Sequence, residues 1–178
     1  MAKIIYREGC EGQNKLFCIE GIEIGLFNGQ KALIFPKYSE EKLLERDQVA
    51  KWSARELSEI EALKVEDTIS ETAALFNLGS PAANWVLLFV TKDRRQFSLP
   101  SLLAAMEIQH QKEEIDALAE TIEGADLLRD FTSNVWSCAG CGASGGWCAN
   151  GYGGYASDDH LYYSNLAVPL VLYREEEI

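Results

Sequence analysis

Residues 134–173 read NVWSCAGCGASGGWCANGYGGYASDDHLYYSNLAVPLVLY, and this stretch decides the fold class of the chain. Glycines, aromatic residues and small polar residues recur in it at short intervals. The glycine content is too high for a helix, and the aromatic content is too high for a disordered segment. We therefore expect a series of short strands whose loops display Trp and Tyr side chains. The stretch contains no recognisable catalytic motif.

The first 38 residues also have the character of β structure. Short apolar or alternating runs rich in Ile, Phe and Tyr are broken by glycines, and Asn28-Gly29 stands between two of these runs. Asn-Gly is a strong hairpin signal because both central residues of a type I′ turn have positive φ. We predict a hairpin with its tip at Asn28 and Gly29.

Residues 39–78 are predicted to be helical because they contain no Gly or Pro and are rich in helix formers. Ser39 is a suitable N-cap, and two glutamates follow it where they complement the helix dipole. Two apolar stripes of different phase predict two helices joined near residues 64–66. Gly79 and Pro81 mark the end of this helical region.

A buried strand and a third helix are predicted between this region and residue 134. The apolar run of residues 84–90 is the strand candidate. The helix is predicted to begin at Pro100, because the N–H groups in the first turn of a helix have no partner within the helix and proline has no N–H to leave unpaired. It is predicted to end at Gly124. Its core face is predicted to contain Ala104, Ile108, Ile115, Leu118 and Ile122. Strands, helices and strands in this order predict an α+β fold.

Composition and charge exclude several function classes. Sixteen Lys and Arg against twenty-eight Asp and Glu give a net charge of −12, and Arg174 is the only basic residue after Asn134. Nucleic acids and anionic membranes are bound largely through Lys and Arg, so we expect neither partner. The longest apolar run is far too short to span a bilayer. No secretory signal is visible at the start, which predicts a cytoplasmic protein, with virion or surface assembly as the alternative.

Three motifs resemble those of a known family. Phe97-Ser-Leu-Pro-Ser101 opens a helix, Val135-Trp-Ser-Cys138 follows as a strand, and Ala167-Val-Pro-Leu-Val-Leu-Tyr173 closes the series. Their order is similar to that in the bacterial domain family named after the C-terminal domain of a Legionella collagen-like adhesin. The resemblance covers roughly residues 84–173.

This resemblance implies a C-type-lectin-like fold, in which two helices flank a twisted antiparallel sheet and a long loop region carries recognition. Residues 1–38 would then be a β-hairpin extension and residues 39–178 the lectin-like domain, with one domain over 1–178 as the alternative. The chain departs from the family at Phe97-Ser98, where tryptophan and arginine are usual, and at Val168-Pro169-Leu170. The signatures of calcium-dependent sugar binding are absent from the sequence, so no calcium-bridged sugar site is implied.

Cysteine spacing raises the question of a zinc site. Zinc takes four Cys or His ligands in a tetrahedron, and a candidate set consists of Cys138, Cys141, Cys148 and His160. A single C-x-x-C with wide spacings to the other two donors departs from the usual ligand patterns. We therefore interpret the five cysteines as reduced structural thiols and expect no cofactor, keeping zinc as the alternative.

The aromatic and acidic side chains of the same stretch are the candidate ligand-binding residues, because Trp and Tyr combine apolar area with one polar group. The candidates are Trp147, Tyr152, Tyr155, Asp158, Asp159 and His160. We expect Trp136 and one of Tyr162 and Tyr163 to be buried. Trp147, Tyr152 and Tyr155 adjoin glycines and are expected to be exposed. The acidic pair is interpreted as a solvated turn, with ligand contact as the alternative.

The sequence therefore predicts a non-enzymatic recognition module that binds a protein or a glycan through the Gly/aromatic loops between Cys141 and Asp159. The absence of a signal peptide suggests a phage or prophage particle component. One alternative is a structural or assembly subunit that forms homo-oligomers through the N-terminal β segment. A metal- or thiol-dependent enzyme is the other.

Overall fold

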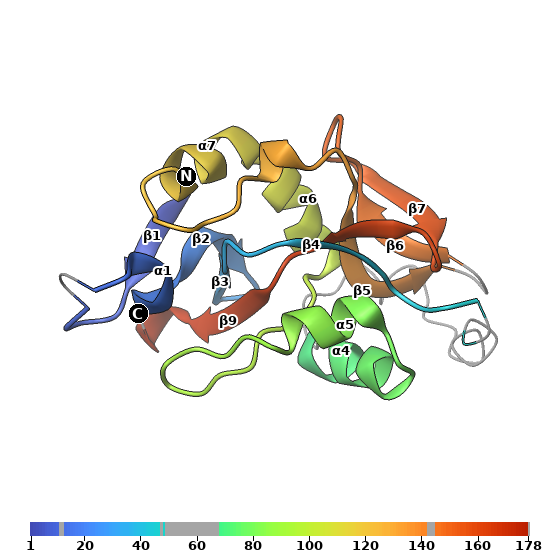
Figure 1. The fold of residues 1–178 in the computed structure, drawn as a ribbon, viewed down its shortest axis with the longest axis horizontal. Helices are drawn as coiled ribbons and strands as arrows, with labels where there is room; N and C mark the ends of the chain where they lie inside the picture. The colour runs from blue at the N-terminus through green and yellow to red at the C-terminus, as the bar shows by residue number, and fades with distance from the viewer. Residues whose placement is uncertain (11–12, 47, 49–67, 142–144, 178) are drawn as a thin grey trace.

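The computed structural model describes residues 1–178 apart from 11–12, 47, 49–67, 142–144 and 178. Two β-sheets lie at the two ends of the molecule, with helices packed against them (Figure 1). The protein is therefore an α+β protein, as predicted. Among the described helices, none is long and apolar enough to cross a membrane.

The four-stranded sheet is built from the N-terminal segment and the last strand. Its order is β1 (Lys3–Tyr6), β2 (Ile19–Phe27), β3 (Gln30–Ile34) and β9 (Leu170–Arg174), and neighbouring strands are antiparallel. The β2–β3 turn has Asn28 at φ 47° and Gly29 at φ 73°, which confirms the predicted hairpin. Because β3 also pairs with β9, the N-terminal segment (residues 1–38) is joined to the other end of the chain. The division into two domains at residue 38 stays a prediction.

The five-stranded sheet contains the stretch with which the sequence analysis began. Its order is β4 (Ser39–Lys42), β8 (Ser164–Ala167), β5 (Val135–Cys141), β6 (Gly145–Ala149) and β7 (Ala156–His160). The pairing is antiparallel except between β5 and β8, where Val135 pairs with Leu166 in parallel. The prediction of short strands with Gly/aromatic loops is confirmed here.

The predicted helix start at Ser39 is wrong, because Ser39–Lys42 forms β4. This strand pairs along its whole length with β8, and the next two residues, Leu43 and Leu44, are fully buried. Pairing with a strand far along the chain thus outweighs local helix propensity. Most of the first predicted helix lies outside the described residues. The second corresponds to α4 (Thr68–Asn77), and Gly79 follows it at φ 83°.

The predicted strand over residues 84–90 is also wrong. Its first half belongs to α5 (Pro81–Val86), whose N-cap Ser80 accepts a hydrogen bond of 3.1 Å from the Ala83 N–H. Pro at the first helical position supports this helix start. Beyond it the chain forms a loop over residues 87–97, with an isolated β-bridge between Val90 and Gln96. The Gln96 side chain donates to the carbonyl oxygens of Leu87 and Phe89, and Leu88 and Val90 are exposed. An apolar run alone does not distinguish a buried strand from such a segment.

The third predicted helix is present as two. They are α6 (Leu102–His110), capped by Ser101 rather than starting at Pro100, and α7 (Lys112–Ala119). The break falls at Gln111, whose side-chain amide donates to the carbonyl oxygen of Ile24 on β2. The predicted core face is confirmed for Ala104, Ile108, Ile115 and Ile122, while Leu118 is partly buried. The described residues also form the short helix α1 (Lys15–Cys18) and the 3₁₀ helices η1 (Leu128–Asp130) and η2 (Glu175–Glu177).

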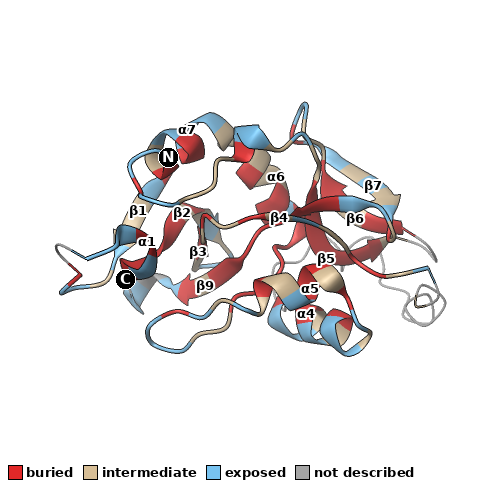
Figure 2. Cartoon of the chain, viewed as in Figure 1, coloured by how far each residue is buried: buried red, intermediate tan, exposed pale blue. Residues whose placement is uncertain are grey.

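The five-stranded sheet has apolar packing on both of its faces (Figure 2). On one face Val135, Ala149 and Leu166 pack with α6 and with the four-stranded sheet. On the other face Trp136 and Cys148 pack with residues of α4 and α5. Helices thus cover both sides of its centre, which leaves the edge strand β7 and the β6–β7 turn at the surface, where β7 alternates between exposed and half-buried residues.

Candidate functional site

The turn between β6 and β7, residues 150–155, is held by backbone and side-chain hydrogen bonds. The Asn150 side chain accepts a bond of 2.8 Å from the Tyr152 N–H, and its backbone carbonyl accepts one of 2.8 Å from the Gly154 N–H. The Asn150 N–H donates to the Tyr155 carbonyl at 2.9 Å. The Asn134 side chain, ahead of β5, accepts from the Gly151 N–H at 3.1 Å. This aromatic turn (residues 150–155) is therefore a defined structure rather than a loose loop.

Two glycines of the aromatic turn allow close contacts that no other residue permits. A Cβ at Gly153 would lie 2.4 Å from the Tyr155 ring, so glycine lets that ring pack against the backbone. Gly154 has φ 67°, and a Cβ there would lie 2.3 Å from the His110 ring at the end of α6. Glycine tolerates both the positive φ and the close approach. The turn is thereby positioned against α6.

Two tyrosines of this turn project into solvent. Tyr152 is 94% exposed and Tyr155 is 58% exposed, as predicted from their glycine neighbours. Trp147, the third ring expected at the surface, is half-buried on β6. Large exposed rings on a fixed backbone are a common feature of recognition surfaces.

Strand register shows which predicted residues share a face with Trp147. It pairs directly with Asp158 on β7, and Gly145 pairs with His160 two residues further along, so Trp147, Asp158 and His160 point to the same side. Asp159 points to the other side, where its carboxylate accepts a hydrogen bond of 3.0 Å from the Asn165 amide. The predicted acidic pair is thus divided, and only Asp158 belongs to the exposed surface.

The prediction that Tyr162 or Tyr163 is buried is wrong. Tyr162 is half-buried and Tyr163 exposed, while the preceding Leu161 is fully buried in the core. Since Leu161 occupies the inward position after β7, the two tyrosines stay outside. They form a ring cluster with His160, which stacks on Tyr162 at 5.2 Å, and the guanidinium of Arg46 lies 4.7 Å above the Tyr162 ring.

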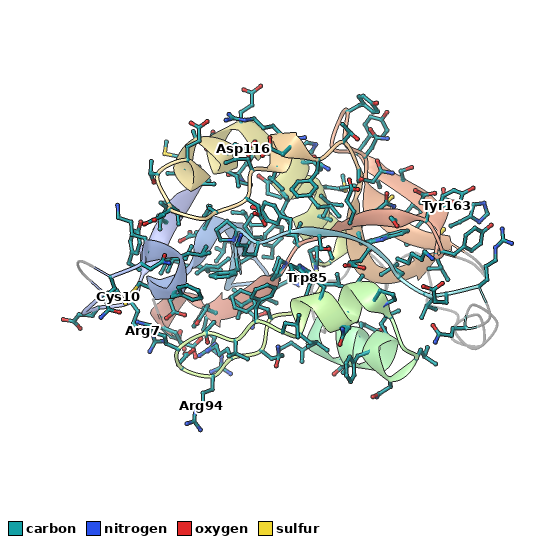
Figure 3. All side chains as sticks on the ribbon, in the orientation of Figure 1. Arg7, Cys10, Trp85, Arg94, Asp116 and Tyr163 are labelled. Atoms are coloured by element: carbon teal, nitrogen blue, oxygen red, sulfur yellow. The ribbon has the colours of Figure 1, made fainter. Side chains whose placement is uncertain are left out.

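The two aromatic groups lie at opposite ends of β7, about 13 Å apart along the strand. Trp147 and Asp158 lie between them. We call this set the β7 surface; it consists of Trp147, Tyr152, Tyr155, Asp158, His160, Tyr162 and Tyr163. Figure 3 labels Tyr163 at this end of the molecule, far from Arg7 and Cys10 at the other end.

The zinc alternative does not match the geometry. Among the residues that the structure describes, no three His, Cys, Asp or Glu side chains are grouped to hold a metal ion. Cys148 lies on the opposite face of β6 from the residues that pair with His160, so these donors do not converge. Burial raises the pKa of the Cys148 thiol to about 12, so this thiol is protonated at neutral pH. Cys138 is buried as well.

A second candidate binding site is an apolar pocket of about 480 Å³, which the sequence did not predict. It lies between α1, the end of β3 and the 87–97 loop, and its wall is a chain of rings from Trp85 through Phe89 and Phe35 to Phe97, with centroids 5.4 to 5.7 Å apart. The Trp85 indole N–H is buried and has no acceptor among the described residues. The apolar run at residues 84–90 was the available signal, but we interpreted it as a strand.

Comparisons of the chain with protein-family models, with curated proteins and with solved structures gave no match. The class that fold and site define is an α+β protein with an exposed aromatic surface on the edge of its five-stranded sheet.

Proposed function

We propose that this protein is a non-enzymatic recognition module that binds a neutral glycan through the β7 surface. The observation that carries the proposal is the aromatic turn, in which Tyr152 and Tyr155 are exposed although their backbone is fixed by hydrogen bonds. Exposing two rings to water without a partner gains nothing for folding, because the hydrophobic effect favours their burial. Exposed rings on a fixed backbone are suited to binding, since little conformational entropy is lost when a ligand is bound.

The chemistry of the surface supports a glycan ligand. Tyrosine and tryptophan faces stack on the apolar faces of sugar rings, and their polar groups and the Asp158 carboxylate can hydrogen-bond sugar hydroxyls. The β7 surface carries the exposed Asp158 carboxylate, which would repel a sulfated or phosphorylated ligand, and the neighbouring Arg46 guanidinium lies against the Tyr162 ring. A neutral, hydroxyl-rich ligand fits this charge.

We extend the proposal to the fold, which we propose is C-type-lectin-like. Support comes from the motif order of residues 84–173 and from helices packed beside a mostly antiparallel sheet whose loops lie at one edge. Recognition through loops at a sheet edge is the arrangement that this fold implies. A place in a phage or prophage particle stays a prediction.

Glycan-array binding of the wild type and of Tyr152→Ala and Tyr155→Ala variants tests the function. We expect each variant to weaken glycan binding about tenfold, as loss of one stacked ring does. Tyr6→Ala is the matched control, because Tyr6 is an exposed tyrosine on β1 in the other sheet. No glycan bound by the wild type, or equal binding by all three variants, would overturn the proposal. Capture of a protein partner that depends on Tyr152 would instead support the protein-binding form.

Assembly through the N-terminal β segment is a second candidate, favoured by the position of β1. This strand ends the four-stranded sheet, and within the described residues no strand pairs with its outer edge. An open edge can pair with a second copy. Light scattering over a range of protein concentrations tests this, and a monomer at every concentration removes the candidate.

A further inference from the structure

Three reactive side chains from separate parts of the chain meet at the end of the four-stranded sheet. Cys10 follows β1, Cys18 is the last residue of α1, and Lys92 belongs to the 87–97 loop. The Lys92 ammonium nitrogen lies 2.6 Å from the Cys10 sulfur and 4.0 Å from the Cys18 sulfur. Figure 3 labels Cys10 at the edge of the molecule.

The hydrogen bonds and charges of this cluster shift the pKa values of its two thiols in opposite directions. Hydrogen bonds from Cys18 and from Lys92 lower the pKa of Cys10, because both stabilise its thiolate. The same contact raises the pKa of Cys18, which keeps its proton as the donor. Lys92 has its own pKa raised by Cys10 and stays an ammonium. The cluster therefore favours the thiolate form of Cys10, retains the proton on Cys18 and places a cation beside both sulfurs.

The surrounding charged groups do not cancel the lowering of the Cys10 pKa. The charge of the Glu20 carboxylate, which is buried on β2, acts on the cluster and raises the pKa of both Cys10 and Lys92. Its charge is compensated by a salt bridge from Arg7, and its other oxygen accepts a hydrogen bond of 3.4 Å from the Tyr173 hydroxyl. The cation beside Cys10 is thus Lys92, and the anion that would repel a thiolate is already paired.

Exposed residues adjoin Cys10 in the sequence. Glu8 and Gly9 before it are exposed, and so are Gln13 and Asn14 after the two residues outside the described set. Cys10 itself is 8% exposed, so a small part of this residue is in contact with solvent. Sensor cysteines combine a stabilised thiolate with such access and a neighbouring second thiol.

We propose that Cys10 is a hydroperoxide-reactive nucleophile and that Cys18 resolves its oxidised form into a disulfide. In the first step the Cys10 thiolate attacks one oxygen of the hydroperoxide. The S–O bond forms, the O–O bond breaks, and the leaving alkoxide or hydroxide takes a proton from solvent. In the second step the Cys18 sulfur attacks the Cys10 sulfenic sulfur, the S–S bond forms, and the hydroxyl leaves as water with the Cys18 proton. The hydroperoxide gains two electrons, and the two thiols lose them.

Hydrogen peroxide is the probe for this reaction, followed by intact-mass measurement and peptide mapping of the full-length protein. We expect the wild type to lose about 2 Da, with Cys10 and Cys18 in one linked pair that dithiothreitol reverses. The Cys18→Ser variant should stop at a gain of about 16 Da on Cys10, and Cys10→Ser should not react at this site.

Variants of Lys92 test whether this lysine activates Cys10 or whether the two thiols merely lie close together. We expect Lys92→Gln to slow the oxidation of Cys10 about tenfold, and Lys92→Arg, which keeps the charge, to retain most of the rate. Circular dichroism of each variant confirms that it is folded. Equal rates in the wild type and Lys92→Gln overturn the proposal. So does a gain of about 14 Da that links Cys10 to Lys92 through an oxygen atom, or a disulfide that contains any of the other three cysteines.

Discussion

The indole nitrogen of Trp136 donates a hydrogen bond of 2.8 Å to the backbone carbonyl of Glu41. Trp136 lies on β5 and Glu41 on β4, with β8 between these two strands in the sheet. The bond therefore reaches across a strand and joins the central strand to the edge. Trp136 is fully buried, so this polar group has its partner where water cannot replace it.

Replacing Trp136 by phenylalanine should destabilise the protein by about 2–4 kcal/mol, because it leaves a cavity and removes the donor to Glu41. Urea unfolding followed by circular dichroism measures this free energy. The same substitution at Trp85 is the matched comparison, since its buried N–H has no acceptor among the described residues. There we expect a loss below about 1 kcal/mol, because removing an unpaired donor offsets the lost ring area. Equal losses at both positions would contradict this account.

Asp116 on α7 stabilises η1 from within the core. Its two carboxylate oxygens accept hydrogen bonds of 2.6 Å from the Leu128 N–H and 2.9 Å from the Arg129 N–H, and the residue is 4% exposed. An amide can accept only at its oxygen, so Asp116→Asn should lower the free energy of unfolding by about 2 kcal/mol. Asp130→Asn, at an exposed aspartate of the same turn, is the control and should change it by less than about 0.5 kcal/mol. A comparable loss in both would refute the capping role.

Gly154→Ala should destabilise the aromatic turn and weaken any binding by the β7 surface. The strain has two parts, a positive φ and the close approach to His110. Gly29→Ala measures the cost of the positive φ alone, since Gly29 has φ 73° and an added Cβ there would meet no atom within 4 Å. We expect a loss of about 1 kcal/mol at Gly29 and a larger loss at Gly154. The double variant Gly154→Ala/His110→Ala should recover the difference, and a failure to recover it would show that the His110 contact is not the cause.

Tyr173 should make the protein sensitive to alkaline pH. Burial raises its pKa from 10 to about 12. A raised pKa means that the folded protein holds the phenol proton more tightly than the unfolded chain does. This contribution to stability is complete below pH 10 and is lost as the pH rises toward 12. The stability difference between wild type and Tyr173→Phe, measured by urea unfolding across this range, should therefore shift in favour of the variant as pH rises. A constant difference would contradict the buried-phenol interpretation.

Local signals predicted the parts of the structure that depend on few neighbouring residues. The Asn28-Gly29 turn requires two positive φ angles, and that requirement is visible in two letters of sequence. Tyr152 and Tyr155 lie beside glycines in a turn, and their exposure follows from the same local chemistry. The burial of Trp136 was predicted correctly, and the structure buries the first six residues of β5 on both faces of the sheet.

Long-range pairing decided the parts that could not be predicted. Ser39–Lys42 has a helix-start pattern but forms a strand, because β8 supplies its hydrogen-bond partners from near the other end of the chain. Leu161 rather than a neighbouring tyrosine entered the core, where it belongs to the same cluster as Leu43 and Trp136. The cluster of Cys10, Cys18 and Lys92 joins residues that sequence spacing does not connect.

The pairing of β9 with β3 has a consequence for biosynthesis. Every strand of the five-stranded sheet lies between β3 and β9 in the chain, so the ribosome makes β9 after all of them. Until then the β2–β3 hairpin has an unpaired edge, and Ala32 and Leu33, which are fully buried in the finished protein, lack part of their cover. A nascent chain of this protein therefore carries an open strand edge through most of its translation, which a chaperone or a neighbouring nascent chain can reach.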